Sequence, residues 1–165
     1  MARRCRLPFQ ARNVPDRKDP MRRTLALVAL TASLLCPTAA HAAEFRTEYD
    51  RVVSAFHAEV RAKDHLTRAD VVRLVQIACY QRGIPGEEWA WLEDAIPAIT
   101  KRESGWRTDA ANPTSSALGI AQFLDAWGAD RYRRDAVWSI DRMVRVYQDG
   151  GKAKIRQHWA ATCTD

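Results

Sequence analysis

The sequence lacks the short motifs that mark many nucleotide- and metal-binding proteins. It has no glycine-rich phosphate-binding loop, no Cys-x-x-Cys pair and no His-x-x-x-His spacing. The first pattern supplies backbone N–H groups to a phosphate, and the other two supply ligands to a metal. We therefore expect no cofactor and no metal site. Ser115 or Ser116 with His158 would form a hydrolase pair, but no nucleophile elbow surrounds either serine.

The sequence also lacks an apolar run long enough to span a membrane. The apolar run at residues 25–35 is too short. It follows Arg22 and Arg23 and precedes Ala40-His41-Ala42, which is typical of a secretory signal peptide. We expect a signal peptide at residues 21–42, cleavage near Ala42, and an exported protein that is periplasmic or secreted.

The stretch before this signal has no periodicity and is polar and rich in arginine. Because a signal peptide normally begins the protein, we expect translation to start at Met21 and residues 1–20 to be a non-native or unstructured extension. Leu35, which precedes Cys36, is not the small residue that a lipoprotein signal requires.

Residues 43–165, which remain after the predicted cleavage, have no excess of positive or negative charge. Residues 1–42 hold 8 of the 26 Lys and Arg residues and 2 of the 20 Asp and Glu residues, which leaves 18 of each in residues 43–165. The net charge of +6 therefore belongs to the presequence, and no nucleic-acid partner is expected. Five arginines are interpreted as a solvated face or as contacts to acidic polymers: Arg131, Arg133, Arg134, Arg142 and Arg145.

Cysteine is scarce, and two of the four cysteines, Cys79 and Cys163, lie after the cleavage site. An oxidising compartment would allow them to form a disulfide that closes a long loop. Two buried free thiols are the alternative. The length of residues 43–165 suits a single domain with one modest core.

The sequence shows neither a convincing alternating strand nor a short repeat, and helical spacing recurs throughout residues 43–165, so we expect a mainly α domain. Thr67 and Asp70 resemble a capping box, Gly83 marks a helix end, and Asp135 marks a helix start. A short helix is expected over residues 119–127, and a break at Gly150-Gly151. The expected apolar stripes are Phe45, Tyr49, Val52, Phe56 and Val60; Val71, Leu74, Val75, Ala78 and Cys79; Val137, Ile140, Val144 and Tyr147; and Ile155 with Trp159.

One further stripe, formed by Trp89, Leu92, Ile96 and Ile99, ends on a carboxyl group, that of Glu103. Pro97 within this stripe is expected to kink the helix or to start a new one. Partial burial would favour the neutral, proton-donating form of the Glu103 carboxyl, and glycoside cleavage needs such a donor. The alternative is a half-exposed glutamate paired with a neighbouring Lys or Arg. The polar loop that follows, residues 104–119, is long for so small a domain and is expected to be functional.

The sequence around this residue closely resembles the signature of soluble lytic transglycosylases. The matching segments are Glu103-Ser104-Gly105-Trp106 and Ala117-Leu118-Gly119-Ile120-Ala121-Gln122. The resemblance covers residues 89–159 and implies a goose-type lysozyme-like fold with a substrate cleft. In this family one glutamate protonates the oxygen between N-acetylmuramic acid and N-acetylglucosamine. The same carboxylate then takes the proton of the muramic C6 hydroxyl, which attacks the anomeric carbon, so that a 1,6-anhydro sugar forms without water.

The resemblance implies that Glu103 is the single catalytic acid and base. The implied substrate-binding positions are Ser104, Trp106, Asn112, Gly119, Gln122 and Tyr147. An ordinary helix-ending role for Ser104, a turn-forming role for Asn112 and a core role for Tyr147 remain alternatives. The common Ala-Tyr-Asn-Ala-Gly segment of the family is absent, and Val146-Tyr147-Gln148 stands in its place. Most of the other tryptophans are expected in the core.

The resemblance implies peptidoglycan glycan strands as the partner, a monomer, and service to a secretion or conjugation apparatus. Two other functions remain open. A hydrolytic lysozyme-like muramidase would need a second carboxylate, for which Asp109 and Asp125 are candidates. A non-catalytic module would bind glycan or a secretion partner through the same cleft.

Overall fold

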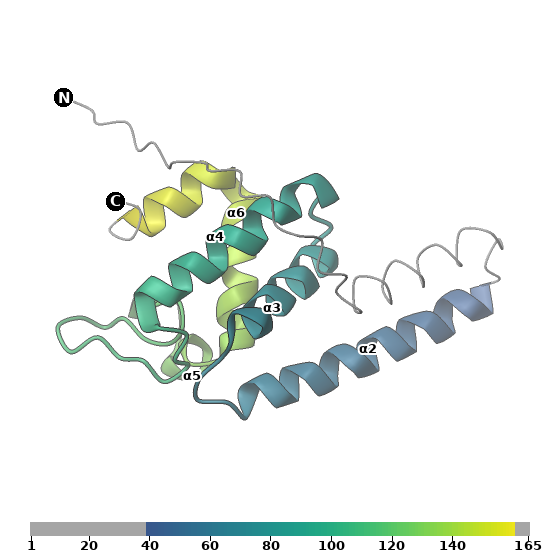
Figure 1. The fold of residues 1–165 in the computed structure, drawn as a ribbon, viewed down its shortest axis with the longest axis horizontal. Coiled ribbons are helices and arrows are strands. Elements are labelled where there is room, and N and C mark those ends of the chain that lie inside the picture. The colour runs from purple at the N-terminus through teal and green to yellow at the C-terminus, as the bar shows by residue number, and fades with distance from the viewer. Residues whose placement is uncertain (1–38, 161–165) are drawn as a thin grey trace, which may run out of the picture. The chain divides into compact units, whose positions relative to one another are not determined.

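The computed structural model describes residues 39–160. These residues form five α-helices, one 3-10 turn and no sheet (Figure 1), so the expectation of a mainly α-helical protein is confirmed. The elements are α2 (Ala39–Arg61), α3 (Arg68–Gln81), α4 (Gly86–Ser104), η1 (Asp125–Trp127), α5 (Asp130–Arg133) and α6 (Ala136–His158). No helix within residues 39–160 is both long and apolar enough to cross a membrane.

Several sequence-based predictions fall on residues outside this range. They concern the extension at residues 1–20, most of the signal peptide and the Cys163 partner of the proposed disulfide. Cys79 itself is fully buried in the core. The pairing, the cleavage site and export therefore stay predictions. Helix α2 includes Ala42, after which cleavage is predicted.

The chain divides into two compact units at the middle of α2, after Val52. In the second unit, α2 contributes Val53, Phe56 and Val60 to the core. The predicted stripe was wrong at Val52, which is exposed, because the buried side chains follow the register of residues 53, 56 and 60 instead. Phe45, in the first unit, is also exposed.

Helix α3 begins with the predicted capping box. The Thr67 hydroxyl accepts from the Asp70 N–H at 3.2 Å, and the Asp70 carboxylate accepts from the Thr67 N–H at 2.8 Å. Such a cap stabilises a helix by about 0.5–2 kcal/mol. The helix ends before Gly83, whose φ of +64° confirms the predicted stop. The predicted core stripe of α3 is buried in full: Val71, Leu74, Val75, Ala78 and Cys79.

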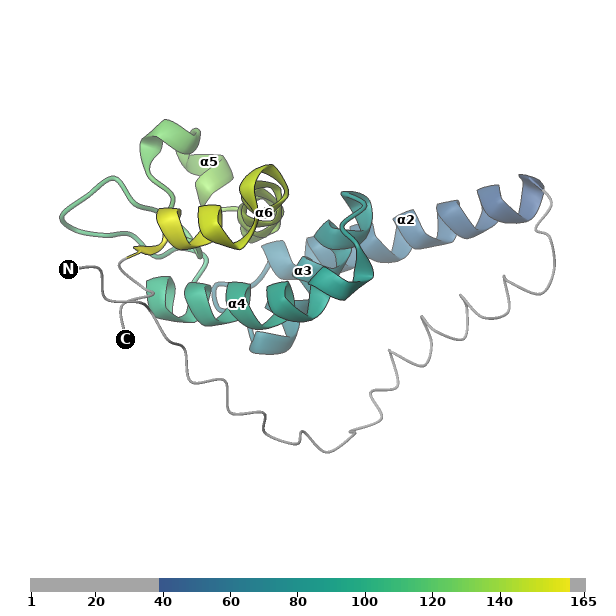
Figure 2. The ribbon, with the colours of Figure 1, turned by 90° about the horizontal axis from the view of Figure 1, so that it is seen from above.

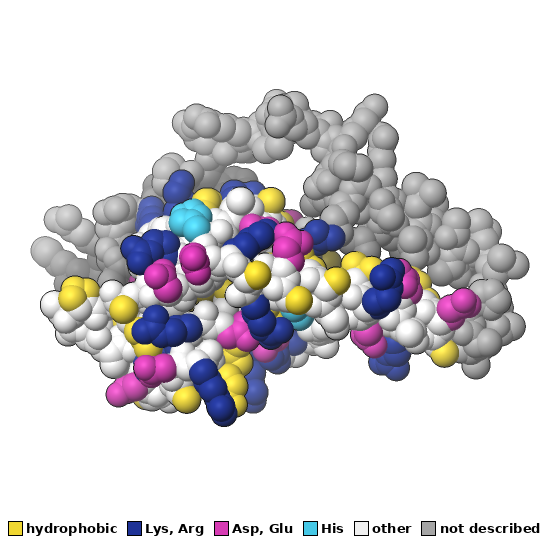
Figure 3. Space-filling view, turned by 90° about the horizontal axis from the view of Figure 1, so that it is seen from below, with side chains coloured by type: hydrophobic (Ala, Val, Ile, Leu, Met, Phe, Trp, Pro, Cys, Tyr) yellow, Lys and Arg dark blue, Asp and Glu magenta, His cyan; other side chains and the backbone are white. Residues whose placement is uncertain are grey.

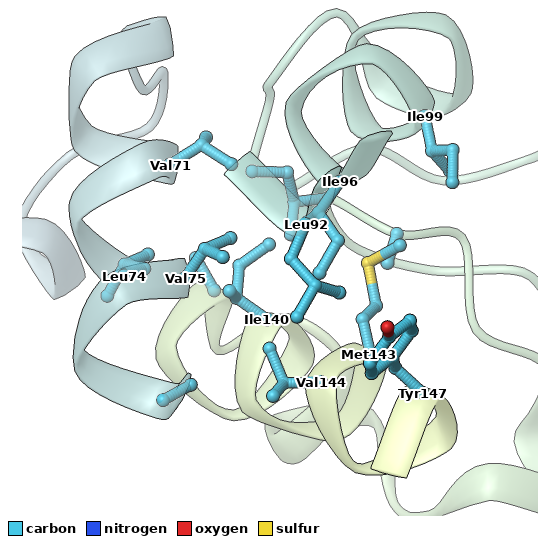
Figure 4. Close-up of a cluster of buried hydrophobic side chains, with 14 of the residues drawn as sticks. Val71, Leu74, Val75, Leu92, Ile96, Ile99, Ile140, Met143, Val144 and Tyr147 are labelled. Atoms are coloured by element: carbon cyan, nitrogen blue, oxygen red, sulfur yellow. The ribbon is translucent and has the colours of Figure 1, made fainter. Parts of the chain in front are cut away.

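The core of the second unit forms where α3 packs against both α4 and α6, which also contact each other (Figures 1 and 2). Figure 4 shows Val75 of α3, Leu92 of α4 and Ile140 of α6 pointing toward one another. All three are fully buried, and burial of each such side chain stabilises the fold by about 1.5–3 kcal/mol. This packing fixes α4, whose last turn carries Glu103.

Helices α4 and α6 each contain a residue that often ends a helix. Pro97 lies inside α4, which continues from Gly86 to Ser104, so no new helix starts at Pro97 as one of the sequence-based alternatives supposed. In α6, Gly150 and Gly151 have non-helical φ and ψ angles, which confirms the predicted break there. Ile155 and Trp159 beyond the break are buried, as expected.

Candidate functional site

Glu103 lies on the last turn of α4 and is half-buried. The residues that precede it on the same stripe, Leu92, Ile96 and Ile99, are buried, so the predicted apolar stripe is confirmed up to the carboxyl. Gly105 then adopts a left-handed conformation with φ +64°, and its N–H donates to the Lys101 carbonyl at 2.9 Å. The carboxyl is therefore carried by the end of a 19-residue helix rather than by a loop.

Ser104 joins this helix end to a distant part of the chain. Its hydroxyl oxygen lies 2.9 Å from the Ile120 carbonyl oxygen and 3.0 Å from the Thr100 carbonyl oxygen, and it accepts from the Trp106 N–H at 3.1 Å. The two segments that carry the family resemblance, residues 103–106 and 117–122, are thus in direct contact. Contact between Ser104 and a saccharide stays a prediction.

The loop that leaves Ser104 is tied to the connection between α2 and α3. The Leu66 N–H donates to the Trp106 carbonyl at 3.0 Å, and the Thr108 N–H donates to the Asp64 carbonyl at 3.0 Å. The Thr108 hydroxyl lies 3.1 Å from the Lys63 carbonyl oxygen. The start of the long loop is therefore anchored at several points.

Trp106 is held close to α4. Its indole N–H donates to the Pro97 carbonyl at 3.0 Å, and the Lys101 ammonium lies 5.2 Å from the ring centroid. The side chain is half-buried and packs against the core, and its φ is +68°. Both the N–H and part of one ring face are thus occupied by the protein, and stacking of this ring on a sugar stays a prediction.

Residues 118–123 form a tight turn, so the predicted helix over residues 119–127 was wrong except at Asp125–Trp127. Leu118 and Phe123 exchange two backbone hydrogen bonds, at 3.0 and 3.1 Å. Gly119 and Gln122 have φ angles of +76° and +51°. Two left-handed residues within four positions cannot belong to a right-handed helix.

Gly119 lies directly against the end of α5. A Cβ at this position would come within 1.8 Å of the Arg133 carbonyl oxygen. The Gly119 N–H donates to the Ala110 carbonyl at 2.8 Å. Only glycine fits here, because the φ angle is positive and no room exists for a Cβ. The fold therefore accounts for Gly119, and its predicted role in substrate binding stays a prediction.

Gln122 turns its amide group toward the loop. Its Nε2 lies 2.9 Å from the Gly119 carbonyl oxygen and 3.3 Å from the Ala110 carbonyl oxygen. Asn112 is exposed, and its Oδ1 accepts from both the Thr114 N–H and the Thr114 hydroxyl at 2.9 Å. The geometry at Asn112 is that of a turn-forming asparagine. Binding of substrate by either side chain stays a prediction.

Tyr147 is not brought to Glu103. It is buried, its ring stacks on Trp91 with centroids 5.4 Å apart, and its hydroxyl hydrogen-bonds with Glu88. Glu88 and Glu103 are separated by about 22 Å along α4, at 1.5 Å per residue. Burial, together with the Glu88 hydrogen bond, raises the pKa of Tyr147 to about 12. The observed position agrees with a core tyrosine that has found a local partner.

The aromatic residues after the loop pack on one another. Phe123 lies at the centre, with its ring centroid 5.1 Å from that of Trp127, 5.5 Å from that of Trp138 and 5.6 Å from that of Trp159. Trp159 is buried, and the other two tryptophans are half-buried against the core. The expectation that most tryptophans serve the core is confirmed for these residues.

Arg133 was wrongly interpreted as part of a solvated face. The residue is only 3% exposed. It donates to the Ser116 carbonyl, to the Phe123 carbonyl at 3.1 Å and to the Asp130 carboxylate at 2.5 Å. The arginine therefore fixes the long loop through the backbone carbonyls of Ser116 and Phe123. The sequence did not indicate this role, because Arg133 lies between Arg131 and Arg134, which are exposed. Arg142 is also partly covered, with its guanidinium 5.2 Å from the Trp127 ring centroid.

Charged side chains of both signs are interspersed on the surface shown in Figure 3. The surface of the described residues has hollows, of which two are considered. One, of about 230 Å³, is lined by Arg61, Thr108 and Arg134 among others. The other, of about 310 Å³, is lined by Ile84, Glu88 and Tyr147 among others. Neither lining includes Glu103, so a substrate cleft beside Glu103 stays a prediction.

Comparison with models of protein families gave no match, and searches of the curated proteins and of the solved structures gave no match.

Proposed function

We propose that residues 43–165 form a lysozyme-like domain that acts as a peptidoglycan lytic transglycosylase. The observation that carries the proposal is the bridge from the Ser104 hydroxyl to the Ile120 carbonyl at 2.9 Å. It joins the helix end bearing Glu103 to the turn bearing Gly119 and Gln122. The two segments that resemble the transglycosylase signature are about 15 positions apart in the sequence, and this hydrogen bond makes them neighbours in space.

In the proposed reaction, the protonated Glu103 carboxyl donates its proton to the glycosidic oxygen between N-acetylmuramic acid and N-acetylglucosamine. The bond from the anomeric carbon to that oxygen breaks as the sugar gains oxocarbenium character. The Glu103 carboxylate then accepts the proton of the C6 hydroxyl, whose oxygen bonds to the anomeric carbon. The carboxyl is regenerated, and no water is consumed.

The proposed reaction needs one carboxylate, whereas a hydrolase would need a second, for which Asp109 and Asp125 are the candidates. Asp109 is exposed and lies 3.2 Å from the Arg107 guanidinium, and the exposed Asp125 accepts from the Ala126 N–H at 2.8 Å. Both carboxylates thus have local contacts, and the proposed reaction uses Glu103 without either of them. We further propose that the enzyme is exported and cuts the wall locally, for a trans-envelope secretion or conjugation apparatus.

Digestion of purified peptidoglycan by wild type, Glu103→Gln and Glu87→Gln tests the activity. Glu87 is an exposed glutamate at the opposite end of α4 and serves as the matched control. Mass spectrometry is expected to detect products lighter by one water than hydrolytic products with wild type and Glu87→Gln, and none with Glu103→Gln. Reducing-end products alone would identify a hydrolase. A Glu103→Gln protein as fast as wild type would refute the catalytic role.

A further inference from the structure

The smaller hollow, of about 230 Å³, is lined by more cations than anions. It lies where the end of α2, the loop after α4 and the junction of α5 with α6 meet. Its charged lining residues are Arg61, Lys63, Arg131, Arg134 and Asp135. Four cationic groups thus share a small concave space with a single carboxylate.

The partners of these groups decide how much positive charge is uncompensated. Lys63 is paired with Glu59 at 2.7 Å and with Asp70 at 3.1 Å, so its charge is balanced. Asp135 accepts from the Val137 N–H at 2.9 Å with one oxygen and from the Arg61 Nε at 3.0 Å with the other. The one lining carboxylate is therefore already engaged.

Arg131 and Arg134 differ from the other cations of the hollow. Within residues 39–160 neither has a carboxylate within 4 Å. Arg131 lies over the Tyr132 ring and donates to its hydroxyl at 2.9 Å, and Arg134 donates one N–H to the Asp109 carbonyl at 3.1 Å. These contacts orient the guanidinium groups without neutralising them.

We propose that this hollow is a binding site for a multivalent oxyanion of the phosphate type, held by Arg131 and Arg134. Planar guanidinium groups match the geometry of phosphate oxygens and form charge-assisted hydrogen bonds with them. Both arginines line the same concave hollow. The proposal is independent of Glu103, which does not line the hollow.

The test is titration of the full chain with inorganic phosphate and pyrophosphate at constant ionic strength, followed by isothermal calorimetry and thermal unfolding. Saturable binding that raises the midpoint of unfolding is expected. The Arg131→Gln/Arg134→Gln double variant is expected to weaken binding about tenfold or more, because charge-assisted hydrogen bonds are lost. Arg145→Gln, an exposed arginine on α6 outside the hollow, is the matched control and should bind as wild type does.

Arg131 and Arg134 are exposed, so the double variant is expected to fold, and circular dichroism checks this. Nuclear magnetic resonance provides a second readout. Addition of phosphate is expected to shift the amide signals of Thr108 and Ala136, which line the hollow. The proposal is overturned if wild type shows no saturable binding, if chloride at equal ionic strength gives the same stabilisation, or if the folded double variant binds as tightly as wild type.

Discussion

The backbone carbonyl of Arg133 occupies the space that a side chain at position 119 would need, 1.8 Å from where a Cβ would stand. Gly119 also has a φ of +76°. The same arginine donates from its side chain to the carbonyls of Ser116 and Phe123 on either side of that glycine. The turn next to the candidate acid is thus fixed from α5, 14 residues further along the chain.

Gly119→Ala is expected to lower the free energy of unfolding by about 2–5 kcal/mol. About 1–2 kcal/mol comes from a left-handed alanine and about 1–3 kcal/mol from the clash with the Arg133 carbonyl. Gly83→Ala is the matched control, since Gly83 has a φ of +64° but nothing within 4 Å of its Cβ position. Urea unfolding measures both variants, and equal losses would show that the close approach to Arg133 carries no cost.

Ser104→Ala is expected to lower the free energy of unfolding by about 1–3 kcal/mol, because the Ile120 carbonyl and the Trp106 N–H lose their shared partner. Peptidoglycan cleavage should fall as well, since the turn is no longer tied to the end of α4. Ser54→Ala, at an exposed position of α2, should leave both stability and activity unchanged. A Ser104→Ala protein with wild-type stability would contradict a bridging role.

Asp135→Ala is expected to cost about 0.5–2 kcal/mol of stability through loss of the α6 cap. The Asp135 carboxylate accepts from the Val137 N–H at 2.9 Å and the Trp138 N–H at 3.4 Å. Thermal unfolding compares this variant with Asp149→Ala, which removes an exposed carboxylate from the same helix. A loss in Asp135→Ala no larger than that in Asp149→Ala would contradict a stabilising cap.

Stability is expected to fall in strong alkali through Tyr147. Burial and the Glu88 hydrogen bond raise its pKa from 10.0 to about 12. The folded state therefore holds the proton more tightly than the unfolded state, so this contribution is fully present below pH 10 and is lost as the pH rises toward about 12. Alkaline unfolding curves of wild type and Tyr147→Phe check this, and the variant should lose less stability over that interval. Identical curves would indicate an unshifted tyrosine.

Local signals in the sequence predicted much of the helical framework. The Thr67–Asp70 capping box, the stop at Gly83, the Asp135 cap and the break at Gly150-Gly151 all lie where the sequence indicated. These features succeed because each depends on residues within one or two turns of one another. The register of α2 was wrong at Val52 because several faces of that helix carry apolar residues, and only packing selects among them.

The site depends more heavily on contacts between distant residues. The sequence alone determined that Glu103 ends an apolar helical stripe and precedes a polar loop. Only the tertiary structure determined that Ser104 contacts Ile120 and that Arg133 is buried and hydrogen-bonded to the loop. It also determined that Tyr147 interacts with Glu88 instead of Glu103. Helical periodicity records which face of a helix is apolar, whereas the identity of a partner 15 or 60 positions away is set by how α4 and α6 pack.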